Sequence, residues 1–126
     1  MARSLSINAI CRLIDALLPG GYPVIEVVAE ILDVSTRTFQ RLLNEEGLSY
    51  SDLVDHCRLQ SACDALEHTQ DSIHGIAATL GYRDTSSFTR AFKRWTGTTP
   101  HSYRKQLQYQ QIKPSNQNVL NIRTIQ

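Results

Sequence analysis

The chain has 126 residues, 41% hydrophobic and 20% charged, which is the composition of one globular domain and excludes a disordered chain. No apolar run reaches the roughly 20 residues that cross a bilayer, and the N-terminus lacks the apolar core of a signal peptide, so we expect a cytoplasmic protein with no membrane contact. The net charge of +1 hides an asymmetry: residues 1–71 carry five basic and eleven acidic side chains, and residues 72–126 carry eight and one. This asymmetry predicts that one half of the chain faces a polyanion.

Apolar residues recur at helical spacing throughout the first half of the chain. The spacing predicts helices from Ile7 to Leu18, where Pro-Gly-Gly follows, and from Val24 to Leu32. A third helix is expected to begin near Ser35 and to stop at Gly47. Ser49 and Asp52 have the spacing of a capping box, which opens a long helix that runs to about His68.

The second half of the chain predicts three more helices and a tail. Asp71 or Ser72 caps a short helix that Gly81 closes, and Asp84 caps the next, which ends at Gly97. Thr99-Pro100 opens a final helix that passes through Tyr103 and Leu107. Beyond about Gln110 the chain has no usable period and is expected to be frayed. The predicted fold class is therefore all-α.

The same unit of sequence occurs twice, in residues 28–53 and 76–103. Each copy predicts a short helix, a tight turn and a second helix, which is the anatomy of a helix-turn-helix. The turn residues, Asp33 and Gly81, both tolerate a left-handed backbone. The matched pairs are Ala29 with Ala77, Leu32 with Leu80, Asp33 with Gly81 and Val34 with Tyr82 at an offset of 48, Phe39 with Phe88, Arg41 with Arg90 and Leu43 with Phe92 at 49, and Gly47 with Gly97, Ser49 with Thr99 and Leu53 with Tyr103 at 50.

The outer face of the second helix in each unit carries side chains suited to DNA. If Phe39 points inward, Arg37 and Gln40 point outward, and such side chains read guanine and adenine edges in a major groove. In the second copy, short hydroxyl side chains lie beside basic residues that can pair with phosphates. Phe88, Phe92 and Trp95 have the spacing of a buried stripe, with Tyr82 and Tyr103 nearby, so we predict an aromatic core in this unit and not base stacking on exposed rings.

The second copy also resembles the signature of the AraC/XylS family, through Gly81-Tyr82-x-Asp84-x-Ser86-x-Phe88-x-Arg90-x-Phe92-Lys93 and Gly97-x-Thr99-Pro100-x-x-Tyr103-Arg104. Arg58, followed by Ala62, Ala65 and Leu66, is similar to the family's connecting helix. The resemblance covers about residues 7–106. It implies an AraC-type DNA-binding domain at 5–108, with helix-turn-helix subdomains at 5–48 and 71–108 and a linker helix at 49–68. A flexible tail is expected at 109–126.

The function that the resemblance implies is that of a bacterial transcription regulator. Its two recognition helices would enter successive major-groove segments of duplex DNA, and its further partners would be RNA polymerase and a separate effector or dimerisation domain. We expect the chain to be a C-terminal piece of a longer regulator, with a stand-alone regulator as the alternative. The predicted DNA-binding residues are Ser35, Thr36, Arg37, Thr38, Gln40 and Arg41 in the first unit and Thr85, Ser86, Ser87, Arg90, Lys93 and Arg94 in the second.

Other classes of function find less support in the sequence. The chain has no H-E-x-x-H, no G-x-S-x-G and no phosphate-binding glycine loop, so we expect no enzyme, no catalytic residue and no cofactor. Cys57 and Cys63 point in different directions from one helix, which argues against a metal site with His56. A helical protein-interaction module without DNA specificity stays open as the alternative.

The cysteines predict a reducing compartment. Cys11, Cys57 and Cys63 are odd in number and contain no C-x-x-C pair, so neither a disulfide framework nor a zinc ribbon is expected. The sequence therefore predicts three small buried thiols.

Overall fold

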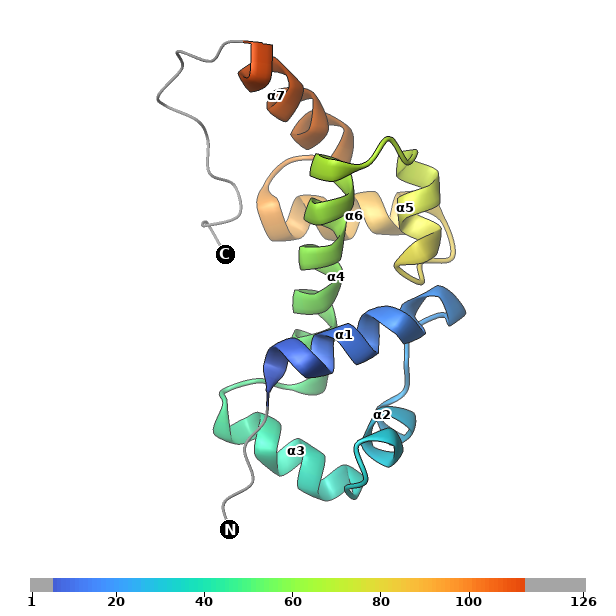
Figure 1. Ribbon diagram of the computed structural model, residues 1–126, viewed down its shortest axis with the longest axis vertical. Coiled ribbons are helices and arrows are strands. Elements are labelled where there is room, and N and C mark those ends of the chain that lie inside the picture. The colour runs from blue at the N-terminus through green and yellow to red at the C-terminus, as the bar shows by residue number, and fades with distance from the viewer. Residues whose placement is uncertain (1–5, 113–126) are drawn as a thin grey trace.

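The computed structural model describes residues 6–112, and the regular elements of this part of the chain are all helices (Figure 1). No strand occurs among the described residues, and the predicted all-α fold class is confirmed. The elements are α1 (Ile7–Leu17), the 3-10 helix η1 (Leu18–Gly20), α2 (Ile25–Ile31), α3 (Thr36–Glu45), α4 (Tyr50–His68), α5 (Ile73–Thr79), α6 (Thr85–Thr96) and α7 (Pro100–Ile112).

The long helix α4 joins two groups of helices (Figure 1). We call α1, η1, α2 and α3 the first unit, and α5, α6 and α7 the second unit. α1 and α7 pack on α4, α2 packs on α3, and α5 packs on α6. η1 touches α5, so the two units also meet directly.

Side-chain caps confirm the predicted starts of α3, α4, α5, α6 and α7, whereas Val24 at the start of α2 has no side-chain cap. The Ser49 hydroxyl accepts the N–H of Asp52 at 3.1 Å, and the Asp52 carboxylate accepts the N–H of Ser49 at 3.2 Å, which completes the capping box. Of the two caps expected for α5, the structure has Ser72. The other side-chain caps are Ser6 for α1, Ser35 for α3, Asp84 for α6 and Thr99 for α7.

The repeat is visible in the hydrogen bonds of the two turns. Asp33 and Gly81 both have positive φ, at 61° and 85°, as the sequence predicted. In each turn the next residue donates its N–H at 3.0 Å to the carbonyl of the small residue in the preceding helix, Val34 to Ala29 and Tyr82 to Ala77. The two units therefore close with the same backbone geometry, and α3 and α6 leave their turns in the same way.

The aromatic residues of the second unit form the predicted core. Phe88, Phe92 and Tyr103 are buried, and Trp95 packs against them partly buried. The ring centroids of Phe92 lie 5.9 Å from Phe88 and 5.5 Å from Tyr103, at steep interplanar angles. The buried face of α6 is thereby fixed, and its opposite face is left to solvent.

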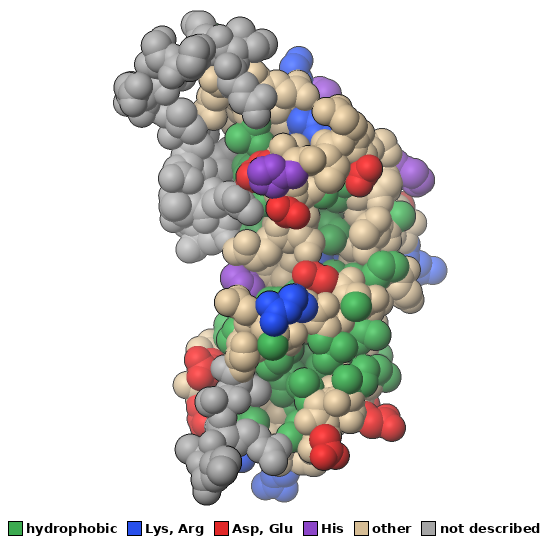
Figure 2. All heavy atoms as spheres, in the orientation of Figure 1, with side chains coloured by type: hydrophobic (Ala, Val, Ile, Leu, Met, Phe, Trp, Pro, Cys, Tyr) green, Lys and Arg blue, Asp and Glu red, His purple; other side chains and the backbone are tan. Residues whose placement is uncertain are grey.

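Two expectations on the helices need correction. The apolar residues of α2 do not form one buried stripe, because Val24, Val27 and Ile31 are exposed by 53%, 42% and 53% while Val28 is buried. α2 has seven residues and lies on the outside of the fold, so the rest of the protein covers only one side of this helix. Figure 2 shows hydrophobic side chains gathered in the lower part of the molecule, with acidic side chains at their edge. α7 continues to Ile112, so the first residues of the predicted tail are helical, and 113–126 lie outside the described residues.

The prediction of three separate thiols is wrong for two of the cysteines. Cys11 on α1 and Cys57 on α4 form a disulfide, with their Cα atoms 5.3 Å apart and a sequence separation of 46. Their spacing in the sequence gives no sign of this, because the crossing of α1 over α4 is a tertiary contact. Cys63 lies outside the bridge and is buried, as expected.

Candidate nucleic-acid interface

The outer face of α3 carries the polar residues that the sequence predicted there. Phe39, Leu42 and Leu43 are buried, so the helix turns its other side to solvent. Arg37 and Gln40 are exposed on that side, and in the part of the chain that the structure describes neither has a side-chain hydrogen bond or ion pair. These two side chains are therefore the most available for an external partner.

Other predicted residues of the first unit are engaged within the protein. The Ser35 hydroxyl accepts the N–H of Thr38 at 3.0 Å and donates to the Thr38 hydroxyl at 3.0 Å. The guanidinium of Arg41 donates to the Glu45 carboxylate at 2.9 Å, and both side chains are largely exposed. Ser35 and Thr38 thus shape the start of α3, and Arg41 would have to share its charge with Glu45. Thr36 is half-buried.

The outer face of α6 is polar and basic. Ser86, Arg90 and Lys93 are exposed at positions i, i+4 and i+7, which lie along one side of a helix. The half-buried Ser87 accepts a long hydrogen bond of 3.4 Å from Arg90. At the start of the helix, the Thr85 hydroxyl lies 3.0 Å from Nδ1 of His74 on α5, a contact that the sequence did not indicate.

The two outer faces correspond position by position at the repeat offset of 49. This correspondence adds Asn44, an exposed residue of α3 that the sequence analysis left out although the repeat could have identified it. It also shows where the units differ, because an acid in one unit takes the place of a base in the other. The matched exposed residues are Arg37 with Ser86, Arg41 with Arg90, Asn44 with Lys93 and Glu45 with Arg94.

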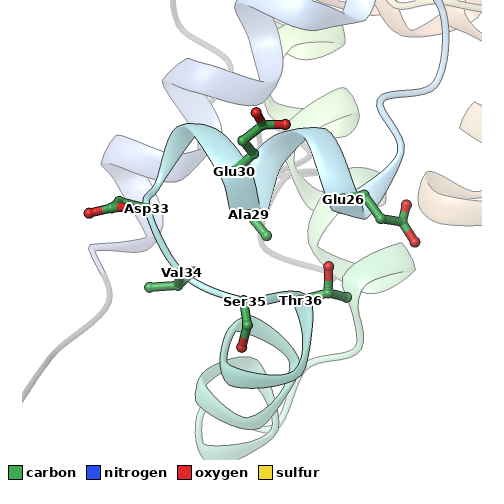
Figure 3. Close-up of a pocket in the computed structure, with 7 residues that line it drawn as sticks. All are labelled: Glu26, Ala29, Glu30, Asp33, Val34, Ser35 and Thr36. Carbon is green, nitrogen blue, oxygen red and sulfur yellow. The ribbon is translucent and has the colours of Figure 1, made fainter.

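Acidic side chains surround the turn of the first unit. Figure 3 shows the hollow between α2 and α3, with Ala29, Ser35 and Thr36 among its lining residues and three carboxylates directed away from its centre. These carboxylates belong to Glu26, Glu30 and Asp33. They place negative charge beside the N-terminal end of α3, which disfavours a close phosphate group.

The second unit has more basic residues, but one of them acts inside the protein. Arg104 donates to four backbone carbonyls at and after the end of α4, the shortest at 2.6 Å to Asp71. Burial raises the pKa of Asp55 on α4, and the positive charges of Arg94 and Arg58 act in the opposite direction. The charge of Arg94 therefore acts on the Asp55 carboxyl of α4. The exposed bases among the described residues of this unit are Arg83, Arg90, Lys93, Arg94 and Lys105.

The start of α6 is fixed by an ionised cap. The Asp84 carboxylate accepts the N–H of Ser87 at 2.7 Å. The backbone and hydroxyl hydrogen bonds of Ser87 hold the pKa of Asp84 below its usual value. Asp84 thus stays charged at neutral pH and anchors the first turn of α6.

No group of three His, Cys, Asp or Glu side chains among the described residues is arranged to hold a metal. None of their helices combines the length and the apolar character that crossing a bilayer requires.

Comparisons with known proteins identify the repeated unit. A family model described as a helix-turn-helix domain matches residues 28–106. The ornithine utilization regulator of Pseudomonas aeruginosa is 39% identical over 87 residues, which make up 69% of this chain and 26% of that protein. The chain spans about a quarter of the length of several curated relatives that it matches, and these are named as regulators.

Solved structures agree with this identification. A DNA-binding transcriptional dual regulator from Escherichia coli K-12 is 26% identical, with a TM-score of 0.74 over 86% of this chain and 99% of that chain. The transcriptional regulator CdpR from Pseudomonas aeruginosa is 39% identical, with a TM-score of 0.66 over 79% of this chain and 31% of that chain.

Proposed function

This chain belongs to the AraC-type helix-turn-helix family, and we propose that it is the DNA-binding part of a bacterial transcription regulator. The observation that carries the proposal is the pair of matching units, each of which turns an arginine-bearing helix face to solvent. α3 and α6 enter successive major-groove segments on one side of a duplex. The complete protein works in the cytoplasm without catalysis, contacts RNA polymerase and carries a separate effector or dimerisation domain.

The two units divide the work of binding. Arg37 and Gln40 on α3 read base edges, and Arg41 assists them in competition with Glu45. Arg90 and Lys93 on α6 contact phosphates and hold the duplex. Support for this division comes from charge, because carboxylates surround the turn of the first unit and exposed bases outnumber acids on the second. The predicted set is completed by Ser35, Thr36 and Thr38 beside α3 and by Thr85, Ser86, Ser87 and Arg94 on α6.

The salt dependence of duplex binding tests the proposed function. We expect the affinity for a random-sequence duplex to fall steeply with salt, with a slope of about 0.9 for each phosphate contact. Replacing Lys93 and Arg94 together by Ala should flatten that slope by up to about 2. Specific and random duplexes should weaken by similar factors, because phosphates carry no sequence information.

The matched comparison is the pair Arg37→Ala and Arg41→Ala. This double variant should reduce the ratio of specific to random affinity more than it changes the salt slope. The opposite pattern in the two double variants would make the first unit the electrostatic anchor. Duplex binding without any salt dependence would reject the proposed function and leave the protein-interaction module as the better description.

Sequence discrimination by α3 can be tested at Gln40. Gln40→Ala should cost about 1 to 3 kcal/mol on the duplex recovered by selection from random sequences, because a bidentate pair with a base is lost. Binding to random DNA should fall much less, since no charge is removed. Gln60→Ala makes the same change at an exposed site on α4 and should leave both affinities intact. Equal losses on the two duplexes would make Gln40 a structural residue.

A further inference from the structure

Arg58 is a buried charge at the middle of α4. Only 7% of its surface is exposed, and a guanidinium in such a place needs hydrogen-bond partners. Its Nε donates to the carbonyl of Leu80 at 2.9 Å, and Nη2 makes a longer bond of 3.4 Å to the carbonyl of Gly81. Both carbonyls belong to the turn between α5 and α6. Arg58 therefore binds α4 to the turn that precedes the second recognition helix.

The same guanidinium also lies against an aromatic ring from each unit. Its Cζ atom is 4.1 Å from the ring centroid of Tyr82, in the second turn, and 5.3 Å from that of Tyr22, just after η1. One side chain of the linker helix thus contacts both units at once. Since α6 begins at Thr85, three residues beyond Tyr82, a fixed Tyr82 leaves α6 little freedom to move.

The backbones of the two units meet at the same place. A Cβ atom on Gly81 would lie 2.5 Å from the carbonyl oxygen of Leu18 and 3.1 Å from the backbone of Gly21. The second turn is therefore pressed against η1 and has no space for a side chain there. The equivalent residue of the first turn, Asp33, is exposed. The close contact belongs to the junction between the units and is not a requirement of the repeated turn.

From this junction we infer that Arg58 is a positioning residue that fixes α6 relative to α3, and so makes binding selective for the spacing of two half-sites on DNA. The inference rests on the proposed function. One added base pair moves the second half-site by about 3.4 Å and rotates it by about 35° around the duplex. A rigid junction cannot follow that movement, whereas a loose one can.

The first arm of the test needs no DNA. Spin labels at Glu46→Cys and Lys105→Cys, both at exposed positions in different units, report the distance between the units in the full chain. The native cysteines are bridged or buried and leave the labels specific. We expect one narrow distance distribution with Arg58 and a broad one with Arg58→Gln. A distribution that stays narrow in Arg58→Gln overturns the inference.

The second arm measures affinity for duplexes selected by the unmodified chain, and for the same duplexes with one base pair added or removed between the half-sites. The unmodified chain should prefer the selected spacing by at least about tenfold. Arg58→Gln should lower that preference to within about threefold, while random-duplex affinity stays within about twofold. An unchanged preference in a folded Arg58→Gln protein contradicts the inference.

Two further variants separate positioning from folding and from charge. Tyr22→Leu removes the ring at the first unit from an exposed site and leaves the Arg58 hydrogen bonds in place, so it should lower the spacing preference while the protein stays folded. Arg12→Gln removes a positive charge from an exposed site on α1 and should leave the preference unchanged. If the unmodified chain binds the selected duplexes without a spacing preference, the inference fails and the proposed function stands. If it binds no duplex in a salt-dependent way, the proposed function fails, and the distance distributions still decide whether Arg58 fixes the two units.

Discussion

Phe92→Ala should lower the free energy of unfolding by about 3 to 5 kcal/mol, which is the usual cost of replacing a buried aromatic side chain by Ala. Phe92 is fully buried and its ring packs between those of Phe88 and Tyr103. The remaining rings come from α6 and α7 and cannot close the cavity without moving a helix. Denaturant unfolding followed by helical circular dichroism measures the change. Ser86→Ala, an exposed change on the same helix, should stay within about 0.5 kcal/mol.

The result for Phe92 also bears on the proposed interface. Arg90 and Lys93 point away from the core only because Phe88 and Phe92 point into it. A Phe92→Ala protein as stable as the unmodified chain would mean that α6 is turned the other way. The basic face would then be buried, and the proposed contacts of α6 with phosphates would have no structural basis.

Local features of the fold were predictable from the sequence. A helix repeats its contacts every three or four residues, so Phe88 and Phe92 reveal the inner face of α6 without any knowledge of what lies against it. Caps are equally local, since the Asp84 carboxylate bonds to an N–H three residues later. The repeat relates the two units, so the sequence alone predicts that the outer faces of α3 and α6 lie on the surface.

The hydrogen-bond partners of individual charged side chains could not be predicted in the same way. Arg104 counts as a base in any charge map, yet its guanidinium is used by carbonyls at the end of α4, more than 30 residues away in the sequence. Arg58 is similar, because its partners lie in a turn that reaches α4 only through the tertiary fold. In α2, Val27 fits an apolar stripe, yet 42% of its surface is exposed. Side-chain partners depend on how helices cross, and helix periodicity does not contain that information.

The disulfide between Cys11 and Cys57 arises from one such crossing and has a large expected effect. Closing a loop with a sequence separation of 46 removes conformational entropy from the unfolded chain. The chain-entropy relation gives about 4 kcal/mol at 25 °C for a loop of this length. Dithiothreitol should therefore lower the free energy of unfolding of the oxidised chain by about that amount, measured by denaturant unfolding with and without the reductant.

Cys11→Ser provides the matched control for this prediction. Cys11 is only half-buried, so the hydroxyl that replaces its sulfur can reach solvent and adds little cost of its own. In oxidising buffer this variant should already have the lower stability of the reduced chain, and dithiothreitol should not change it further. Equal stability of the unmodified chain in both buffers would show that the bridge does not contribute to folding.

A bridge that does contribute ties α1 to α4 one residue away from Arg58. Its loss should therefore also loosen the contact between α4 and the first unit, where Tyr22 meets the guanidinium. The spin-label distance distribution should then broaden when Cys11→Ser is added to the labelled chain that keeps Arg58, in the direction expected for Arg58→Gln.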